Sequence, residues 1–322
     1  MKPILPVFMM LVLLATSCYA TERKGENMSD FKKDIKLRDW KELWSDGFEL
    51  LLIRFPDFIA EKKIYEIKDR RESDLTIGRK ALSPNSTKIA FTVGNFGKPP
   101  INDNLYIIDT NSLAIKKIGY SQSDLIGVNG FMGNDRLLLN GNMHVDQDGM
   151  LIHEETKDKS SYLSVFNFNT KKLKILRDLG ISTVGMANSK CAGDLLAYDT
   201  GDGFVVYNVN TKNTTKINKK GDLVSISPDG QKILFKDVDD YYLVDQNGQN
   251  QELILTKKEI DKFIPLDIKL RGGYWEVQFS SWSPEGRYIL FNESSDRNKG
   301  KKYILDVENK ELERVKGVTP IF

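Results

Sequence analysis

One stretch, Ser280 to Phe291, recurs in weaker copies along the chain and constrains the fold more than any other feature of the sequence. It reads as a strand that ends at Trp282, followed by a turn in which Pro284 fixes φ and Gly286 accepts an unusual φ. A nearly unbroken apolar run from Tyr288 to Phe291 comes next. Such a run, bounded by turn residues, is typical of a strand buried on both faces.

Copies of this unit lie upstream at a regular spacing. A nearly identical copy begins at Ser227, a copy without the glycine begins at Ser83, and two degenerate copies begin at Gly133 and Ala192. The copies at Ser83 and Ser227 are 144 positions apart, which the other two divide into three units of roughly 48 residues, a period typical of propellers and other repeat arrays. A second pair of short strands follows each copy, separated by Asn, Asp, Gly, Lys or Thr, the residues of tight hairpins. Each unit therefore has four strands.

The sequence Ser-Pro-Asp-Gly at 227–230, followed by a strand that ends in Phe235, resembles the WD-repeat-like propeller repeat of the TolB type. The resemblance covers roughly residues 45 to 317 and implies an all-β fold, a β-propeller of four-stranded antiparallel blades. Counting units from residue 45 predicts six blades, whereas five would leave the N-terminal residues outside the ring. The same blade type serves non-catalytic interaction proteins and the propeller domains of prolyl oligopeptidase relatives, so it implies no single function.

Residues 1–20 are typical of a secretory signal peptide. Lys2 provides a positive start, and Ile4 to Ala15 is apolar but too short to span a bilayer. Ordinary cleavage would make Thr21 the first mature residue. Alternatively, Cys18 ends a sequence that resembles a bacterial lipobox and would be acylated. Both alternatives predict an extracytoplasmic protein, periplasmic or secreted, and the second adds a lipid anchor.

Residues 21–44 are open to more than one interpretation. Ser29 is placed to cap a helix that would run to Trp44. In the alternative, Ile35 to Trp40 forms the inner strand of a first blade, with 48–54 as the next strand, and otherwise the segment is a linker. We favour the strand because it completes six units. Residues 45–322 are predicted to form a single propeller domain.

Charge and cysteine content narrow the class of partner. The chain has 47 Lys and Arg against 45 Asp and Glu, so the net charge of +2 is near balance. No basic stripe stands out, which argues against nucleic-acid binding. Beyond Cys18 the only cysteine is Cys191, so no internal disulfide is expected, and we interpret Cys191 as a small core residue. We expect a monomer without a cofactor that reaches the membrane only through Cys18.

The loops that join the second and third strands of each unit are long, and propeller geometry predicts that they share one face of the disc. Because binding residues often lie on loops held by a rigid scaffold, we predict a recognition face there. The alternative is that the loops are only solvated hairpin ends. The polar and aromatic side chains of these loops are Phe96, His144, Asp146, Asp148, His153, Glu154, Glu155, Asp202, Asp237, Asp239, Asp240, Glu293, Asp296 and Arg297.

The segment from Met143 to Glu155 holds both histidines of the chain. Its Asp-Gln-Asp-Gly sequence lacks the third Asx residue of an EF-type calcium loop. The two histidines with nearby carboxylates also suit zinc. We favour a plain elongated hairpin with Asp148 and Gly149 in its turn, and we assign no metal site.

No catalytic signature occurs: the sequence lacks a Gly-x-Ser-x-Gly elbow, a Cys-x-x-Cys pair, a zinc-protease helix and a phosphate-binding loop. Asp239 and Asp240 are adjacent and more typical of a turn than of an acid–base pair. Residues 256–273 predict a short inserted helix. We therefore predict a non-catalytic protein-binding or scaffolding module of the bacterial envelope with a protein partner. The main alternative is a propeller hydrolase or lyase with a site at the channel mouth, and a calcium- or sugar-binding sensor is a third.

Overall fold

The computed structural model divides the chain into two units, Met1–Ile35 and Lys36–Phe322, and every described residue belongs to the second. The structure describes residues 41–45, 48–54, 59–67, 75–95, 103–121, 126–153, 162–176, 179, 188–263, 275–295 and 302–315. The predicted signal sequence, Cys18 and the segment before residue 41 lie outside these residues. Within the described ranges, no helix combines the length and the apolar character that crossing a membrane requires.

The described strands form six sheets. Sheet 1 contains β1 (Lys41–Ser45), β2 (Glu49–Arg54) and β3 (Ile59–Glu66). Sheet 2 contains β4 (Thr76–Leu82), β5 (Lys88–Gly94), β6 (Asp103–Asp109) and β7 (Ile115–Ser121), extended by β11 (Leu151–His153) and β10 (Met143–Val145). Sheet 3 contains β8 (Gly127–Phe131), β9 (Arg136–Asn140), β12 (Leu163–Asn167) and β13 (Lys172–Ile175).

The remaining sheets come from the second half of the chain. Sheet 4 contains β14 (Lys190–Ala192), β15 (Leu195–Asp199), β16 (Phe204–Asn208) and β17 (Thr214–Ile217). Sheet 5 contains β18 (Asp222–Ile226), β19 (Lys232–Asp237), β20 (Asp240–Asp245) and β21 (Glu252–Leu255). Sheet 6 contains β22 (Trp275–Trp282), β23 (Tyr288–Ser295), β24 (Lys302–Asp306) and β25 (Glu311–Val315).

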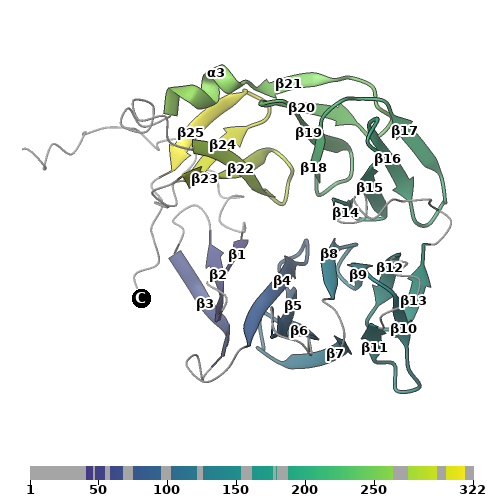
Figure 1. Cartoon of the computed structure of the whole chain (residues 1–322). Helices are drawn as coiled ribbons and strands as arrows, with labels where there is room; N and C mark the ends of the chain where they lie inside the picture. Colours follow the sequence, from purple (N-terminus) through teal and green to yellow (C-terminus); the bar gives the residue numbers. More distant parts are fainter. Residues whose placement is uncertain are drawn as a thin grey trace, which may run out of the picture. The chain divides into compact units, whose positions relative to one another are not determined.

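The sheets follow one another in chain order around a central axis, with the first strand of each sheet innermost (Figure 1). Consecutive strands within a sheet pair antiparallel, and sheets 3 to 6 each have four strands. This confirms the predicted all-β fold with six blades. Two sheets depart from the predicted pattern: sheet 1 has three described strands, and sheet 2 has six because a hairpin is added to its outer edge.

The structure describes the N-terminal segment only from Lys41. β1 starts at Lys41 and pairs with β2, whereas the predicted strand at 35–40 lies outside the described residues. Because residues 41–45 are extended, the alternative helix from Ser29 to Trp44 is wrong for its last turn. The predicted second strand at 48–54 corresponds to β2.

Apolar side chains packed between neighbouring sheets form the core. Five buried clusters join sheets 1 and 2, 2 and 3, 3 and 4, 4 and 5, and 5 and 6. The phenylalanine that ends the repeat motif is at most 1% exposed in sheets 2, 5 and 6, so the second strands are buried on both faces as predicted. Each of these rings contacts an aromatic ring of the preceding sheet: Phe91 with Tyr65, Phe235 with Phe204, and Phe291 with Tyr241.

The three Ser-Pro turns share one hydrogen-bond scheme. The serine hydroxyl oxygen accepts a bond from the backbone N–H five residues later, at 2.9 Å in each copy: Lys88 to Ser83, Lys232 to Ser227, and Tyr288 to Ser283. The residue three positions after the serine has a positive φ, which favours glycine. It is Gly230 or Gly286 in two copies, with φ of 75° and 76°, and Ser86 in the third, with φ of 57°. We call the end of the sheets that carries these turns the turn end.

A second hydrogen-bond scheme recurs in the turn between the third and fourth strands, which also lies at the turn end. The last residue of the third strand is Asp or Asn, and its side-chain oxygen accepts bonds from two backbone N–H groups in the turn, an Asx turn. Bond lengths lie between 2.8 and 3.3 Å. The five residues are Asp109, Asn167, Asn208, Asp245 and Asp306.

The opposite end of the sheets, which we call the loop end, carries the connections between second and third strands. One of them holds the hairpin of β10 and β11, in which Gly149 has a φ of 76°. β11 lies parallel to β7 and pairs Leu151 with Gly119. A Cβ on Gly119 would lie 2.8 Å from the carbonyl oxygen of Leu151, so glycine permits this close approach. A hairpin from the connection in sheet 3 thus extends sheet 2.

The predicted short helix corresponds to α3 (Lys257–Ile260), which continues into the 3-10 turn η4 (Asp261–Phe263). Thr256 caps α3 in a capping box with Glu259. Ile260 is buried in the cluster that joins sheets 5 and 6, and Phe263 packs against the same cluster. The insertion therefore covers the outer part of that junction.

Candidate binding site in the central channel

Several residues of the predicted recognition face lie outside the described residues. They are Phe96, Glu154, Glu155, Asp296 and Arg297. Glu293 is described: it lies on β23, is 7% exposed and accepts a hydrogen bond from the hydroxyl of Tyr303.

The hairpin residues are placed apart from the other loops. The hairpin folds back along the outside of the sheets, so its tip meets the β12–β13 turn at the turn end, where Lys171 donates to the carbonyl oxygen of Asp148. Asp146 builds the tip, since its Oδ1 accepts bonds from two backbone N–H groups of the turn. His144 is half-buried on β10, and His153 is buried on β11. The hairpin interpretation with Asp148 and Gly149 in the turn is confirmed.

The remaining predicted residues lie in short turns at the loop end. Asp202 and Asp237 are exposed. Asp239 forms an ion pair of 2.7 Å with Lys257, and Asp240 Oδ1 accepts a bond from the backbone N–H of Lys257. The connection between β19 and β20 is a tight turn, as we interpreted these two aspartates. The described loop residues therefore build turns and hold α3, and they do not converge on one site.

A buried polar cluster lies where β11 meets β7. His153 Nδ1 and Ser121 Oγ are hydrogen-bonded at 3.2 Å, and both side chains are buried. Asp103 pairs with Ser121 across the strands, and its Oδ2 accepts a bond of 2.9 Å from the backbone N–H of Ile126. Burial raises the pKa of Asp103 to about 6, although bonds from Ile126, Asn104 and Thr92 oppose the rise. The cluster is enclosed by the fold, so it serves the junction of sheets 2 and 3.

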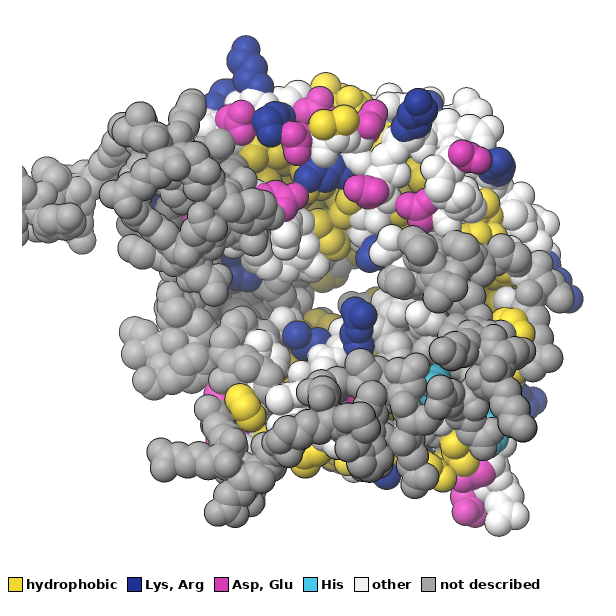
Figure 2. Space-filling view, in the orientation of Figure 1, with side chains coloured by type: hydrophobic (Ala, Val, Ile, Leu, Met, Phe, Trp, Pro, Cys, Tyr) yellow, Lys and Arg dark blue, Asp and Glu magenta, His cyan; other side chains and the backbone are white. Residues whose placement is uncertain are grey.

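A cavity of about 430 Å³ lies inside the ring, where the inner strands of all six sheets approach the turn end. Figure 2 shows the corresponding hollow at the centre of the molecule. Pro84, Pro228 and Pro284 of the three Ser-Pro turns contribute to its wall. Because all six sheets contribute to the wall, the cavity depends on their arrangement around the axis rather than on any one sheet.

The cavity exists because small side chains recur at one position of the repeat. From sheet 2 onwards, the last residue of each inner strand lies opposite a buried apolar residue in the first or second position of the second strand, which sets the inner strands in a common register. One residue before that last position, five sheets carry small residues, and all of them line the cavity. They are Ala81, Gly130, Cys191, Ser225 and Ser281.

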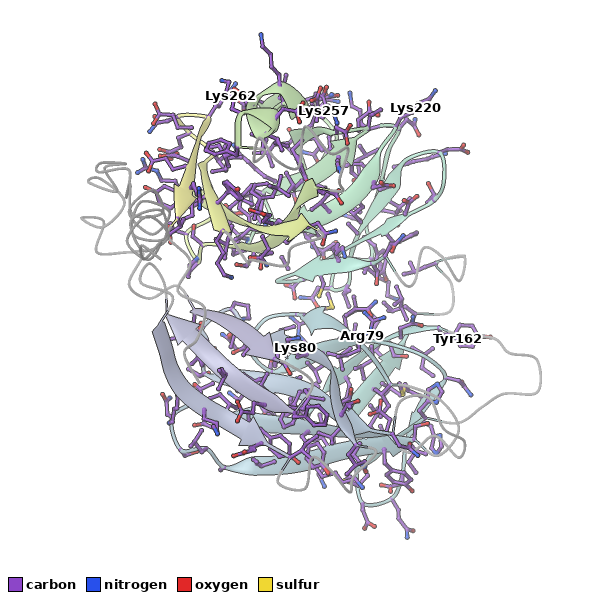
Figure 3. The ribbon with its side chains drawn as sticks, turned by 60° about the vertical axis from the view of Figure 1, so that its left-hand side comes forward. Arg79, Lys80, Tyr162, Lys220, Lys257 and Lys262 are labelled. Atoms are coloured by element: carbon purple, nitrogen blue, oxygen red, sulfur yellow. The ribbon has the colours of Figure 1, made fainter. Side chains whose placement is uncertain are left out.

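The charged side chains of the cavity wall are both lysines. Lys41 of β1 and Lys80 of β4 line it, and none of the described lining residues is Asp, Glu or His. Figure 3 shows Lys80 beside Arg79 on β4, where the sheet faces the interior of the ring. The remaining polar groups of the wall are mainly the hydroxyls of serines and the amide of Asn129. The wall therefore presents positive charge and hydrogen-bond donors.

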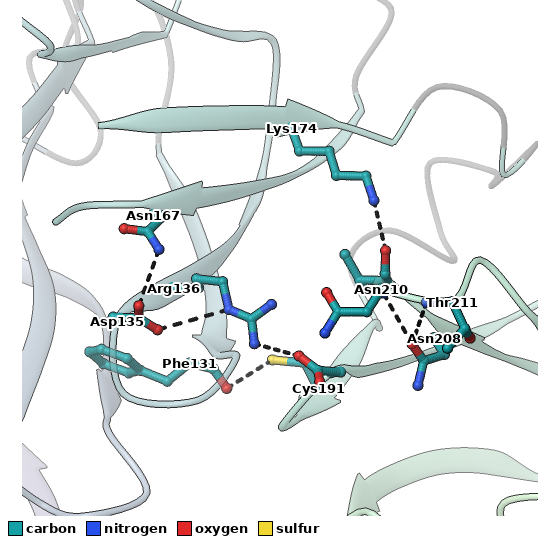
Figure 4. A network of polar contacts seen from close by, with 11 residues as sticks. Phe131, Asp135, Arg136, Asn167, Lys174, Cys191, Asn208, Asn210 and Thr211 are labelled. Carbon is teal, nitrogen blue, oxygen red and sulfur yellow. Dashed lines mark hydrogen bonds and ion pairs between the residues drawn. The ribbon is translucent and has the colours of Figure 1, made fainter. Parts of the chain in front are cut away.

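Contacts between neighbouring turns brace the rim of the cavity. Arg136, the first residue of β9, forms an ion pair of 2.5 Å with Asp194 in the turn between β14 and β15, and also approaches Asp135 (Figure 4). Cys191 Sγ donates to the carbonyl oxygen of Phe131 at 3.4 Å. Burial raises the pKa of the Cys191 thiol to about 12. Cys191 thus spans the junction as a neutral, half-buried group, in agreement with a structural role.

Sequence reasoning missed this site. The cavity residues precede the Ser-Pro motif on strands without a shared consensus, and the rule that favours loops directed attention to the opposite end of the sheets. The available signal was positional: aligning the residues just before each turn reveals the recurrent small residue and, one step earlier, the lysines at 80 and 190.

No family model and no curated protein matches this chain. Among solved structures, it is similar to TolB from Acinetobacter baumannii, with a TM-score of 0.52 and 15% identity over 85% of this chain, and it spans 62% of the length of that protein. It is also similar to a putative TolB from Agrobacterium tumefaciens, with a TM-score of 0.51 and 10% identity over 79% of this chain and 83% of that one. The fold is therefore that of the TolB-type propeller.

Proposed function

We propose that the chain is a non-catalytic binding module of the bacterial envelope and that the channel cavity at the turn end receives a segment of a partner protein. The cavity carries this proposal, because its volume of about 430 Å³ falls in the range of ligand sites, roughly 300 to 1,000 Å³. Its wall belongs to hydrogen-bonded inner strands of the sheets, so a ligand would meet a surface that the fold has already formed. The similarity of fold to TolB structures supports the proposal without assigning a partner.

The chemistry of the wall favours binding over hydrolysis or lyase activity. Acid–base catalysis requires a carboxylate, histidine or similar group placed against the substrate. The described wall offers lysines, hydroxyls and a neutral thiol instead. Groups of this kind suit recognition of a hydrogen-bond acceptor more than proton transfer.

The place of action is part of the proposal. The signal sequence at 1–20 would export the chain, and Cys18 would anchor it if the lipobox is processed. Replacing Cys18 with Ala tests the anchor: we expect the variant to move from the membrane fraction to the soluble fraction. A variant that stays in the membrane fraction would argue against acylation.

The binding site is tested by capture from envelope extract with two matched variants. Ser225→Tyr would fill the cavity from a half-buried position, and Asp202→Tyr would add the same bulk to an exposed turn at the loop end. Partners identified with the wild type are then measured in purified form. We expect Ser225→Tyr to abolish binding and Asp202→Tyr to leave it unchanged. If Asp202→Tyr abolished binding and Ser225→Tyr did not, the binding site would lie at the loop end instead.

A further inference from the structure

We propose that the cavity selects an acidic segment, a stretch of partner chain rich in carboxylates, which Lys80 of the cavity wall and the adjoining Arg79 and Lys190 hold through charge-assisted hydrogen bonds. The inference rests on the proposed function, because it names the chemistry of the segment that the cavity receives. It is carried by the distribution of charge inside the ring rather than by the shape of the cavity.

Basic residues adjoin the cavity on two sheets. Lys80 of β4 and Lys190 of β14 hold the same position of the inner strand, two residues before its last residue. Lys80 lines the cavity and follows Arg79, and Lys190 precedes Cys191, which also lines the cavity. Burial lowers the pKa of Lys190, and the positive charge of Arg79 also lowers it, while Cys191 acts in the opposite direction. The inner strands therefore place positive charge beside the cavity from two sheets.

Within the part of the chain that the structure describes, the Lys190 ammonium has no hydrogen bond and no ion pair, although the residue is half-buried. A buried charge without a partner costs free energy that folding must offset. An anionic ligand removes this cost by supplying the missing partner. Sites kept at the expense of stability are typical of function.

The charge of the wall itself favours an acidic ligand. The cavity wall near the turn end carries lysines and no described carboxylate, and Figure 2 shows Lys and Arg side chains beside the central hollow. A segment rich in carboxylates is therefore attracted into the cavity.

The test uses the full-length protein and two labelled decapeptides. One peptide alternates Glu and Gly, and the other alternates Gln and Gly. Fluorescence anisotropy at low salt measures binding. We expect the Glu peptide to bind at least about tenfold more tightly than the Gln peptide, a difference of roughly 1.4 kcal/mol. Added salt should weaken the binding of the Glu peptide. Equal binding of the two peptides would overturn the proposal.

Two double variants locate the interaction. Arg79→Gln with Lys190→Gln should weaken binding of the Glu peptide by about tenfold or more. Lys220→Gln with Lys262→Gln removes the same charge from exposed positions that lie away from the cavity (Figure 3). This control should change binding by less than about twofold. An equal loss in both would indicate general surface attraction and would overturn the proposal.

Two further measurements separate the remaining explanations. Citrate in competition distinguishes a peptide site from a small-anion site, and displacement at the same carboxylate concentration as the peptide would overturn the assignment to a chain segment. The thermal midpoint of Lys190→Gln should be equal to or above that of the wild type, because an unpaired charge is removed. A lower midpoint would show that Lys190 is a structural residue. If the purified partner still binds the Arg79 and Lys190 double variant but not Ser225→Tyr, the binding module stands and only its acidic preference fails.

Discussion

The two ends of the sheets follow different rules. At the turn end, one hydrogen-bond scheme recurs at Ser83, Ser227 and Ser283, and one Asx turn recurs between the third and fourth strands. At the loop end each connection is individual: a tight turn before β20, a turn at Asp202, and a hairpin that docks on the neighbouring sheet. The cavity lies near the turn end, and the buried polar cluster of Asp103, Ser121 and His153 lies at the loop end.

The difference separates turns that are stabilised locally, at the turn end, from connections that are stabilised by tertiary contacts, at the loop end. Turns that satisfy their own backbone groups need no help from neighbouring sheets, so they recur unchanged while the side chains before them vary. Connections at the loop end depend on tertiary partners, as His153 depends on Ser121. We therefore expect substitutions at the turn end to act locally and those at the loop end to act through sheet junctions.

The largest expected effect comes from Asp103 at the loop end. Its pKa of about 6 in the fold exceeds the ordinary value of 3.8, so the folded state holds a proton that the unfolded state has released between these pH values. Stability therefore falls as pH rises from about 4 to about 6, by up to about 3 kcal/mol. Urea unfolding at a series of pH values measures this slope.

Asp103→Asn is the matched variant, because an amide keeps an oxygen for the Ile126 N–H and does not titrate in this range. We expect its unfolding free energy to be flatter between pH 4 and 6 and, near neutral pH, higher than that of the wild type. If the unfolding free energies of the two proteins varied with pH in the same way, titration of Asp103 would not be the cause of the pH dependence.

At the turn end the largest effect is expected for Ser283→Ala. Ser283 is fully buried, and its hydroxyl accepts the Tyr288 N–H at 2.9 Å. Alanine would leave this N–H without that acceptor, which costs about 1 to 3 kcal/mol. Chemical denaturation gives the value. Ser225→Ala is the control, since that hydroxyl has only a 3.4 Å contact and should cost less than about 0.5 kcal/mol.

A smaller effect tests the positive φ that the Ser-Pro turns share. Gly286→Ala should destabilise by about 1 kcal/mol, because φ is 76° while the new Cβ would still lie 3.8 Å from its nearest neighbour. Ser86→Gly, at the same turn position in sheet 2, should stabilise by about 0.5 to 1 kcal/mol. Changes of the same sign in both variants would contradict the shared turn geometry. Thermal unfolding of the two variants decides this.

The smallest effect is expected for Lys257→Ala at the loop end. Its ion pair with Asp239 joins side chains that are 59% and 41% exposed, and such pairs contribute less than about 0.5 kcal/mol. The difference should vanish in high salt. A loss that persists in salt would mean that α3 is anchored by this pair rather than by Ile260 and Phe263.

The repeated parts of the fold were predictable from the sequence because local chemistry determines them. Serine, proline and glycine at 283, 284 and 286 specify the turn, and the apolar run up to Phe291 specifies a strand buried on both faces. The hairpin at Asp148 was predictable for the same reason. Counting such units was sufficient to obtain six blades.

The docking of the hairpin and the cavity were not predictable in this way. The parallel pairing of β11 with β7 depends on contacts between residues far apart in the sequence, including the bond between His153 and Ser121. The cavity results from small residues that only the packing of the sheets around the axis brings together, such as Ala81 and Ser281. Neither feature has a local periodicity or motif.

Cys191 is a native thiol whose alkylation can report whether the channel is occupied. Its thiol lies in the cavity wall, and with a pKa of about 12 almost none of it is thiolate at neutral pH, so alkylation of the folded chain should be slow. Raising the pH increases the rate of alkylation and leaves the steric access of the reagent to the Cys191 sulfur unchanged. The extent of labelling with and without a bound molecule therefore maps occupancy of the channel interior without an engineered label.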